Sequence, residues 1–336
     1  MRLGLTIAFV VLAAALGLAA PASAEDFYAG KTVTIMVGFP PGGGFDANAR
    51  LLARYIGRHI PGTPSVIVVN APGAGSLTSV WRLDVNLPTD GTVIDTFNFG
   101  LINDALLRPD QTKIDFRDYA WIGSISEDLS TCYLWREDGP KTIAQMKLAG
   151  HYLFGGAGTG TSDDINTKIL QRVFGVDLTE IKGYSGSAAI RLAIERGEIN
   201  GDCGTWSSIP EDWTKSPKLH PLLRTRASVP DGMSPDVPYV VDIAPDQETR
   251  KTIRFLLADG ELGRPFIASH AVPADRVRIL RDAFAAAVKD PGFIAEARAL
   301  RLPVSPKTGA EAEGIIKSLY ATPTSIIDTA RKIVAE

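Results

Sequence analysis

The chain has 336 residues, of which 45% are hydrophobic, 22% charged and 8% aromatic, and its formal net charge is -3. This composition is typical of a globular protein and excludes a disordered, collagen-like or coiled-coil chain. The 35 Lys and Arg residues against 38 Asp and Glu lack the basic excess of nucleic-acid-binding proteins, so no nucleic-acid partner is expected. The length allows about two domains.

Residues 1–24 have the three parts of a secretory signal peptide. Arg2 precedes an apolar run, and the small residues Ala22 and Ala24 lie just before Glu25. The apolar run is also about long enough for a membrane anchor. Pro21 and the small residues favour cleavage instead, so we expect export from the cytoplasm.

Export changes the interpretation of the two cysteines. Cys132 and Cys203 are the only pair available, and oxidising compartments favour disulfides. We predict one bond between them. The alternative is two buried free thiols.

Short apolar runs that end in turn residues and continue into helical periodicity indicate strand–helix units. Strands are predicted at 32–39, 65–69, 92–99, 151–154, 179–183 and 199–203. Helices are predicted at 46–58, from 77 onward, after 162, up to 196, and at 247–257, 274–289, 291–300 and 310–336. Residues 215–238 are polar and rich in proline. Alternating strands and helices predict an α/β fold with parallel sheets, and two such series predict two lobes.

Glycines and hydroxyl residues follow four of these strands, at 42–46, 73–76, 156–162 and 184–187. The first turn of a helix has unpaired N–H groups that attract anions. Helix N-termini from two lobes that face one cleft suit a small organic acid such as a dicarboxylate. The alternative is that these residues only make turns and caps.

Nucleotide, metal and catalytic motifs are not found. Gly30-Lys31-Thr32 lacks the first glycine of a P-loop, and the loop at 156–160 lacks the third glycine of a dinucleotide-binding turn. No G-x-S-x-G motif occurs, and the four histidines lack metal-binding spacing. We therefore expect no cofactor, no metal and no catalytic residues. A Ser-His-Asp triad from distant positions stays open as an alternative.

The loop motifs resemble the TctC/Bug family, the periplasmic solute-binding proteins of tripartite tricarboxylate transporters. The resemblance lies in the segments at 39–46 (Phe-Pro-Pro-Gly-Gly-Gly-Phe-Asp), 70–75 (Asn-Ala-Pro-Gly-Ala-Gly), 88–92 (Pro-Thr-Asp-Gly-Thr), 158–161 and 184–186. These segments occur in the same order over nearly all of the chain after residue 24.

The resemblance implies a two-lobe clamshell of the type II periplasmic-binding-protein kind, with a mostly parallel sheet in each lobe. Lobe 1 is expected at 25–122 plus 229–336, and lobe 2, inserted in it, at 123–228. It also implies a periplasmic receptor, expected to be a monomer. Such a receptor closes on a small carboxylate-bearing solute and delivers it, without ATP, to a permease of one large and one small subunit.

Ligand contacts are predicted from both lobes. From the first lobe they are Phe39, Gly43, Phe45, Asp46, Ala74, Gly75 and Ser76. From the second lobe they are Thr159, Gly160, Thr161, Ser162, Tyr184, Ser185, Gly186, Thr205 and Trp206. Asp46 also has the position of a helix cap.

The chain departs from the family pattern at several of these positions. Phe45 replaces a small residue or Thr, Asp164 or its neighbour replaces a His, and Ser185 replaces a Lys. Together with Asp163 and Asp202, which add negative charge, these changes argue against simple citrate-like recognition and leave room for a less charged, aromatic or amino-bearing acid. Two other functions remain open: a secreted hydrolase-like enzyme acting on a carboxylic substrate, and a ligand sensor for a signalling partner.

Overall fold

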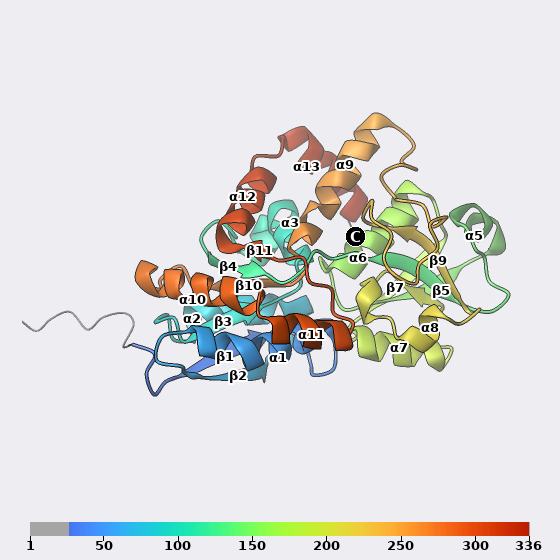
Figure 1. The fold of residues 1–336 in the computed structure, drawn as a ribbon. Coiled ribbons are helices and arrows are strands. Elements are labelled where there is room, and N and C mark those ends of the chain that lie inside the picture. Colours follow the sequence, from blue (N-terminus) through green and yellow to red (C-terminus); the bar gives the residue numbers. More distant parts are fainter. Residues whose placement is uncertain (1–26, 336) are drawn as a thin grey trace, which may run out of the picture.

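The computed structural model describes residues 27–335, and these form two β-sheets with helices packed around them (Figure 1). The predicted signal peptide at 1–24 lies outside the described residues. Of the helices between residues 27 and 335, none combines the length and apolar character needed to cross a bilayer.

The first sheet has the strand order β11-β4-β10-β3-β1-β2. Its strands are β1 (Thr32–Val37), β2 (Ser65–Asn70), β3 (Val93–Thr96), β4 (Ala120–Ser124), β10 (Pro265–Ala268) and β11 (Lys307–Thr308). In β1, Val33, Ile35 and Val37 pack into one hydrophobic cluster, and Met36 packs into another on the opposite face. Alternate residues of a strand point to opposite faces, so helices cover this sheet on both sides.

The second sheet has the order β7-β6-β8-β5-β9. Its strands are β5 (Thr131–Trp135), β6 (Tyr152–Gly156), β7 (Leu178–Lys182), β8 (Gly201–Asp202) and β9 (Leu219–Arg224). All of them come from one continuous stretch of chain between β4 and β10. The lobe boundaries at 122/123 and 228/229 stay a prediction.

Each sheet is mixed. β1 to β4 share one direction while β10 and β11 oppose them, and β6 to β9 share one direction while β5 opposes them. Most strands of each sheet therefore share one direction, as expected. Because the opposed strands pair with some of them, each sheet contains both parallel and antiparallel pairings. The opposed strands include β5, by which the chain enters the second sheet, and β10, which inserts between β3 and β4 after the chain returns.

The helices complete both layers. They are α1 (Gly44–Ile56), α2 (Leu77–Val85), α3 (Gly100–Leu107), α4 (Pro109–Thr112), α5 (Ile143–Ala149), α6 (Ser162–Lys168), α7 (Ser187–Glu195), α8 (Glu211–Thr214), α9 (Gln247–Ala258), α10 (Ala274–Ala287), α11 (Pro291–Ala299), α12 (Gly309–Tyr320) and α13 (Thr324–Val334). The predicted single helix at 310–336 is wrong: it is α12 and α13, separated at Thr322 and Pro323, because proline disfavours a helical residue before it. The predicted strand at 92–99 is shorter, and α3 starts at Gly100.

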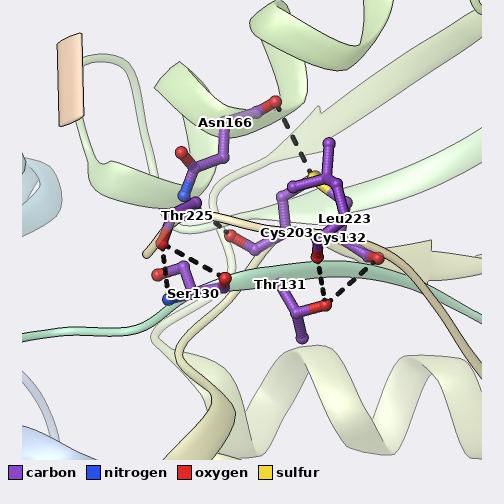
Figure 2. Close-up of a disulfide and its surroundings, with 7 residues drawn as sticks. All are labelled: Ser130, Thr131, Cys132, Asn166, Cys203, Leu223 and Thr225. Atoms are coloured by element: carbon purple, nitrogen blue, oxygen red, sulfur yellow. Dashed lines mark hydrogen bonds between the residues drawn. A yellow bond between two sulfur atoms is a disulfide. The ribbon is translucent and has the colours of Figure 1, made fainter. Parts of the chain in front are cut away.

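The predicted disulfide between Cys132 and Cys203 is confirmed. It joins β5 to the residue that follows β8, and both cysteines are fully buried. Figure 2 shows the bond beneath α6, where the side-chain amide of Asn166 donates to the carbonyl oxygen of Cys203 at 3.5 Å. The bond therefore fixes the position of the end of β8 against β5.

Candidate functional site

A pocket lies where loops that follow strands of both sheets come together. Its lining includes most of residues 39–45, which follow β1, and residues 185–190, which follow β7. It also includes Asp202, at the end of β8, and Gly204, Thr205 and Ser208, which follow β8. The pocket encloses about 740 Å³ of empty space, including the part open to solvent. Ligands of α/β proteins bind at such strand ends.

Two helices begin at this pocket. Gly43 precedes the first turn of α1, a helix of 13 residues, and Gly186 precedes the first turn of α7, a helix of 9 residues. Gly186 has φ 147°, in the region that favours glycine. No side chain caps either helix, so the first N–H groups of both remain available to a ligand.

Aromatic residues line the pocket beside these two helix starts. The rings of Phe39 and Phe45 stack with centroids 5.1 Å apart and an interplanar angle of 13°, and the guanidinium of Arg264 lies 4.6 Å from the Phe45 ring centroid. Arg264 is 2% exposed and its Nη1 lies 3.2 Å from Oδ1 of Asp128. Its charge is therefore balanced within the protein, and the rings of Phe39 and Phe45 form an apolar part of the pocket lining.

Seven of the predicted ligand contacts line this pocket: Phe39, Gly43, Phe45, Ser162, Ser185, Gly186 and Thr205. They come from four separate loops. The other nine do not line it, for three different reasons.

Asp46 is held by its own surroundings. Its carboxylate accepts hydrogen bonds from the Gly42 amide at 3.0 Å, the Asn70 side chain at 2.9 Å and Arg50 at 3.0 Å. Burial acts to raise the pKa of Asp46, but these hydrogen bonds lower it below its usual value. Its structural role is to fix the loop before α1.

The loops at 74–76 and 159–161 contact each other. A Cβ on Gly75 would lie 2.5 Å from Cγ2 of Thr161, so only glycine allows this approach. The members of these loops are Ala74, Gly75, Ser76, Thr159, Gly160 and Thr161. Together they form a contact between segments of the two sheets beside the pocket.

Tyr184 and Trp206 pack into a hydrophobic cluster of the second sheet. Nε1 of Trp206 donates to the carbonyl oxygen of Asp231 at 3.1 Å, and the ring lines a separate groove. Both aromatics therefore pack into the core of the second sheet and do not line the pocket.

Several residues of the pocket were not among the predicted contacts. Asn98, after β3, accepts hydrogen bonds at Oδ1 from the Gly100 amide at 2.8 Å and from the Ser162 amide at 3.1 Å. Arg264, before β10, is brought in by a distant part of the chain. Neither follows a glycine-rich strand end, so no local signal pointed to them.

Two buried acids, Asp163 and Asp202, also line the pocket. Burial raises the pKa of Asp163, although the Thr161 side chain and the Ala157 amide, which donates at 2.6 Å, act in the opposite direction. Burial also raises the pKa of Asp202 well above its usual value, and the neighbouring Asp163 adds to the effect. Within residues 27–335, no group of three or more His, Cys, Asp or Glu is arranged to hold a metal ion.

No protein-family model matches the chain. A UPF0065 protein of Agrobacterium vitis, named for the TAR-I ttuE-ttuC' intergenic region, is 29% identical over 224 residues, which are 65% of this chain and 63% of that protein. A UPF0065 protein of Pseudomonas sp. (strain P51), named for the tcbD-tcbE intergenic region, is 28% identical over 180 residues, or 52% of each chain. The chain thus spans between half and two thirds of the length of these relatives.

The structure of periplasmic binding protein BugD matches with a TM-score of 0.72 at 19% identity, over 91% of this chain and 98% of that one. R. palustris Rpa4515 with adipate matches with a TM-score of 0.70 at 18% identity, over 89% and 97% of the two chains. MatC from Rhodopseudomonas palustris with bound malate matches with a TM-score of 0.66 at 18% identity, over 90% and 99%. The resemblance to the TctC/Bug family is confirmed.

The fold is the two-lobe α/β fold of these periplasmic binding proteins, as the sequence predicts. The pocket contains groups that can donate hydrogen bonds to an anion. Its lining offers the amides of two helix starts and the hydroxyls of Ser162, Ser185 and Ser187. The guanidinium of Arg264 faces the pocket already paired with Asp128.

Proposed function

We propose that this protein is a periplasmic receptor that captures a small carboxylate-bearing solute in the pocket between its two lobes. The observation that carries the proposal is that α1 and α7, from opposite sheets, both begin at one pocket without side-chain caps. Each start provides N–H donors and a partial positive charge, worth about 0.3–1 kcal/mol for a nearby anion. A carboxylate bound there would contact both lobes.

The apolar part of the pocket supports a solute with a hydrocarbon or aromatic body. Phe39, Phe45 and Ile190 lie beside the helix starts. Two proteins of the same fold were solved with adipate and with malate, which are small dicarboxylates with a hydrocarbon chain. The ligand class of those proteins agrees with the chemistry of this pocket.

We further propose, from the same resemblance, that the loaded receptor delivers its solute to a two-component membrane permease and acts as a monomer. Export by the signal peptide at 1–24 would bring it to the periplasm. Its role there is binding, since the fold is that of solute-binding proteins. Closing of the lobes around the solute would present a distinct surface to the permease.

The test is a thermal-shift screen of purified protein with dicarboxylates, tricarboxylates, aromatic acids and amino acids. A ligand at 100 times its Kd should raise the Tm by roughly 5 °C or more. If no acid raises the Tm, the proposal is wrong.

A variant locates the binding to this pocket. Ser185 is exposed and lines the pocket, so Ser185→Glu places a negative charge beside the proposed carboxylate. We expect affinity to fall by roughly tenfold or more through like-charge repulsion. Ser325→Glu, at an exposed position in the first turn of α13, adds the same charge elsewhere and should leave affinity unchanged.

A further inference from the structure

Asp202 is a buried acid of the pocket whose carboxylate lacks a full set of partners. It ends β8, is 4% exposed and lines the pocket. Its Oδ1 has no hydrogen-bond partner. A buried polar atom without a partner destabilises the protein, so a ligand that donates a hydrogen bond to this atom would be favoured.

The position of Asp202 is fixed from two sides. Asp202 pairs with Tyr133 of β5 in the second sheet. The residues next to this pair, Cys132 and Cys203, are joined by the disulfide (Figure 2). The backbone at the end of β8 is therefore held in place, and the Cys203 amide is a hydrogen-bond donor to the Asp202 carboxylate.

No cationic side chain within residues 27–335 forms an ion pair with Asp202. Arg191 is close enough to attract it electrostatically, but its Nη1 donates to the carbonyl oxygen of Ser208 at 2.7 Å. Arg264 is paired with Asp128. Both arginines near the pocket are thus engaged by other groups of the protein and not by Asp202.

Asp163 lines the same pocket and is 7% exposed. Its Oδ2 accepts from the Ala157 amide at 2.6 Å. Two buried acids and two helix starts therefore share one pocket, which is the pattern expected for a ligand that has both a negative and a positive group.

We propose that the solute carries a protonated amine as well as its carboxylate, and that Asp202 accepts a hydrogen bond from this ammonium, with Asp163 adding negative charge nearby. The proposal rests on the proposed function and narrows the ligand class to amino acids and related zwitterions. The ammonium supplies the missing donor to Oδ1, while the amides of α1 and α7 receive the carboxylate. The stacked Phe39 and Phe45 accommodate the side chain.

The test compares matched ligands that differ only in the amine. Isothermal titration calorimetry would measure L-phenylalanine against 3-phenylpropanoate, and L-glutamate against glutarate. In at least one pair we expect the amino member to bind about tenfold more tightly or better, since a hydrogen bond to a charged group is worth about 1.5–3 kcal/mol. This comparison needs only the unaltered protein.

The variant Asp202→Asn tests whether Asp202 causes the preference for the amino member. The substitution keeps the size of the side chain and removes its charge, so the preference for the amino member should fall to roughly twofold or less. Ser185→Glu should weaken both members of a pair to a similar extent, because it acts on the carboxylate they share. The Tm of each variant without ligand shows that it is folded.

The outcomes separate the two proposals. If acids bind but their amino counterparts bind no more tightly, or if Asp202→Asn keeps the preference, the ammonium site is wrong and the carboxylate receptor stands. If neither the acids nor the amino acids bind, the proposed function fails and this inference fails with it.

Discussion

The acids around the pocket show that residue type alone does not determine charge. Asp46 accepts hydrogen bonds from Gly42, Arg50 and Asn70, which lower its pKa despite burial. Asp202 has burial without comparable donors, and its pKa is raised well above the usual value. The sequence identified both as acids near the cleft, but only the surrounding donors distinguish a structural carboxylate from one available to a ligand.

Asp202 gives a pH prediction for the protein without ligand. Burial raises the pKa of Asp202 and Asp163 adds to this, while the hydrogen bond from the Cys203 amide and the charge of Arg191 act in the opposite direction. Between the unfolded pKa of about 3.9 and the higher folded value, the folded state holds one more proton than the unfolded state. The free energy of unfolding therefore falls as pH rises through this range, relative to a variant without the carboxyl.

Urea unfolding of the unaltered protein and of Asp202→Asn at pH 4.5 and pH 8 measures this effect. The stability of the unaltered protein relative to the variant should be lower at pH 8 than at pH 4.5. Other raised acids, such as Asp95 and Asp259, are present in both proteins and cancel in the difference. An equal difference at the two pH values contradicts the prediction.

At the scale of elements, sequence patterns predicted the strands that have local helical partners. β1, β2, β6 and β7 each precede a helix within a few residues, and their apolar runs end in glycine or asparagine loops. β4, β5, β9 and β10 were not predicted, because their pairings join segments far apart in the chain. Such pairings leave no pattern within a short window.

β9 shows the limit most clearly. Its sequence contains His220 and Pro221, and a proline within an apolar run argues against a central strand. β9 is an edge strand of the second sheet, and Pro221 pairs with Tyr133 next to a register shift in the ladder. The proline is tolerated there because an edge strand can leave an N–H side unpaired.

Local sequence patterns also predicted only part of the site. Phe39, Gly43 and Gly186 were predicted because they belong to strand-end loops whose chemistry is local. Gly75 and Thr161 belong to similar loops but contact each other instead. Only the three-dimensional arrangement of the two sheets decides which loops face the pocket.

The disulfide between β5 and the end of β8 should contribute to the stability of the fold. Cys132 and Cys203 are 71 residues apart, so their bond restricts a long loop of the unfolded chain. We expect the Cys132→Ala/Cys203→Ala double variant to lose about 2–4 kcal/mol of stability, measured by guanidinium unfolding. Alanine avoids the cost of a buried hydroxyl at these fully buried positions.

Reductant provides the control for this variant. It should lower the stability of the unaltered protein and leave the double variant unchanged. If reductant and the double substitution both have no effect on stability, the bond does not contribute to folding. The end of β8, with Asp202, should also lose its fixed position, so the double variant should bind ligand more weakly.

For the whole molecule, the two sheets share one hydrophobic cluster. It includes Phe97 beside β3 of the first sheet, Phe154 of β6 in the second, and Val334 of α13. α13 packs against α3 and α9 as well as α6, so the end of the described chain lies between segments of both lobes (Figure 1). A continuous core of this kind favours a single cooperative unfolding transition.

Lys168 connects the end of α6 to this arrangement. It is 5% exposed, its Nζ donates to the Val334 carbonyl oxygen at 2.7 Å, and it pairs with Asp164 at 3.2 Å. Lys168→Met keeps the length of the side chain and removes both contacts, so we expect a loss of about 1–3 kcal/mol. Lys332→Met, at an exposed position of α13, should change stability by less than about 0.5 kcal/mol.

Hydrogen exchange with mass spectrometry, at increasing urea, shows whether the lobes unfold together. Peptides from β1 to β3 and peptides from β5 to β8 should lose protection at the same urea concentration in the unaltered protein. Because Lys168 links α6 to α13, which packs against α3 and α9, Lys168→Met should lower that concentration for both groups of peptides. Separate transitions for the two groups would show that each lobe is stable by itself, and the shared cluster would then not couple them.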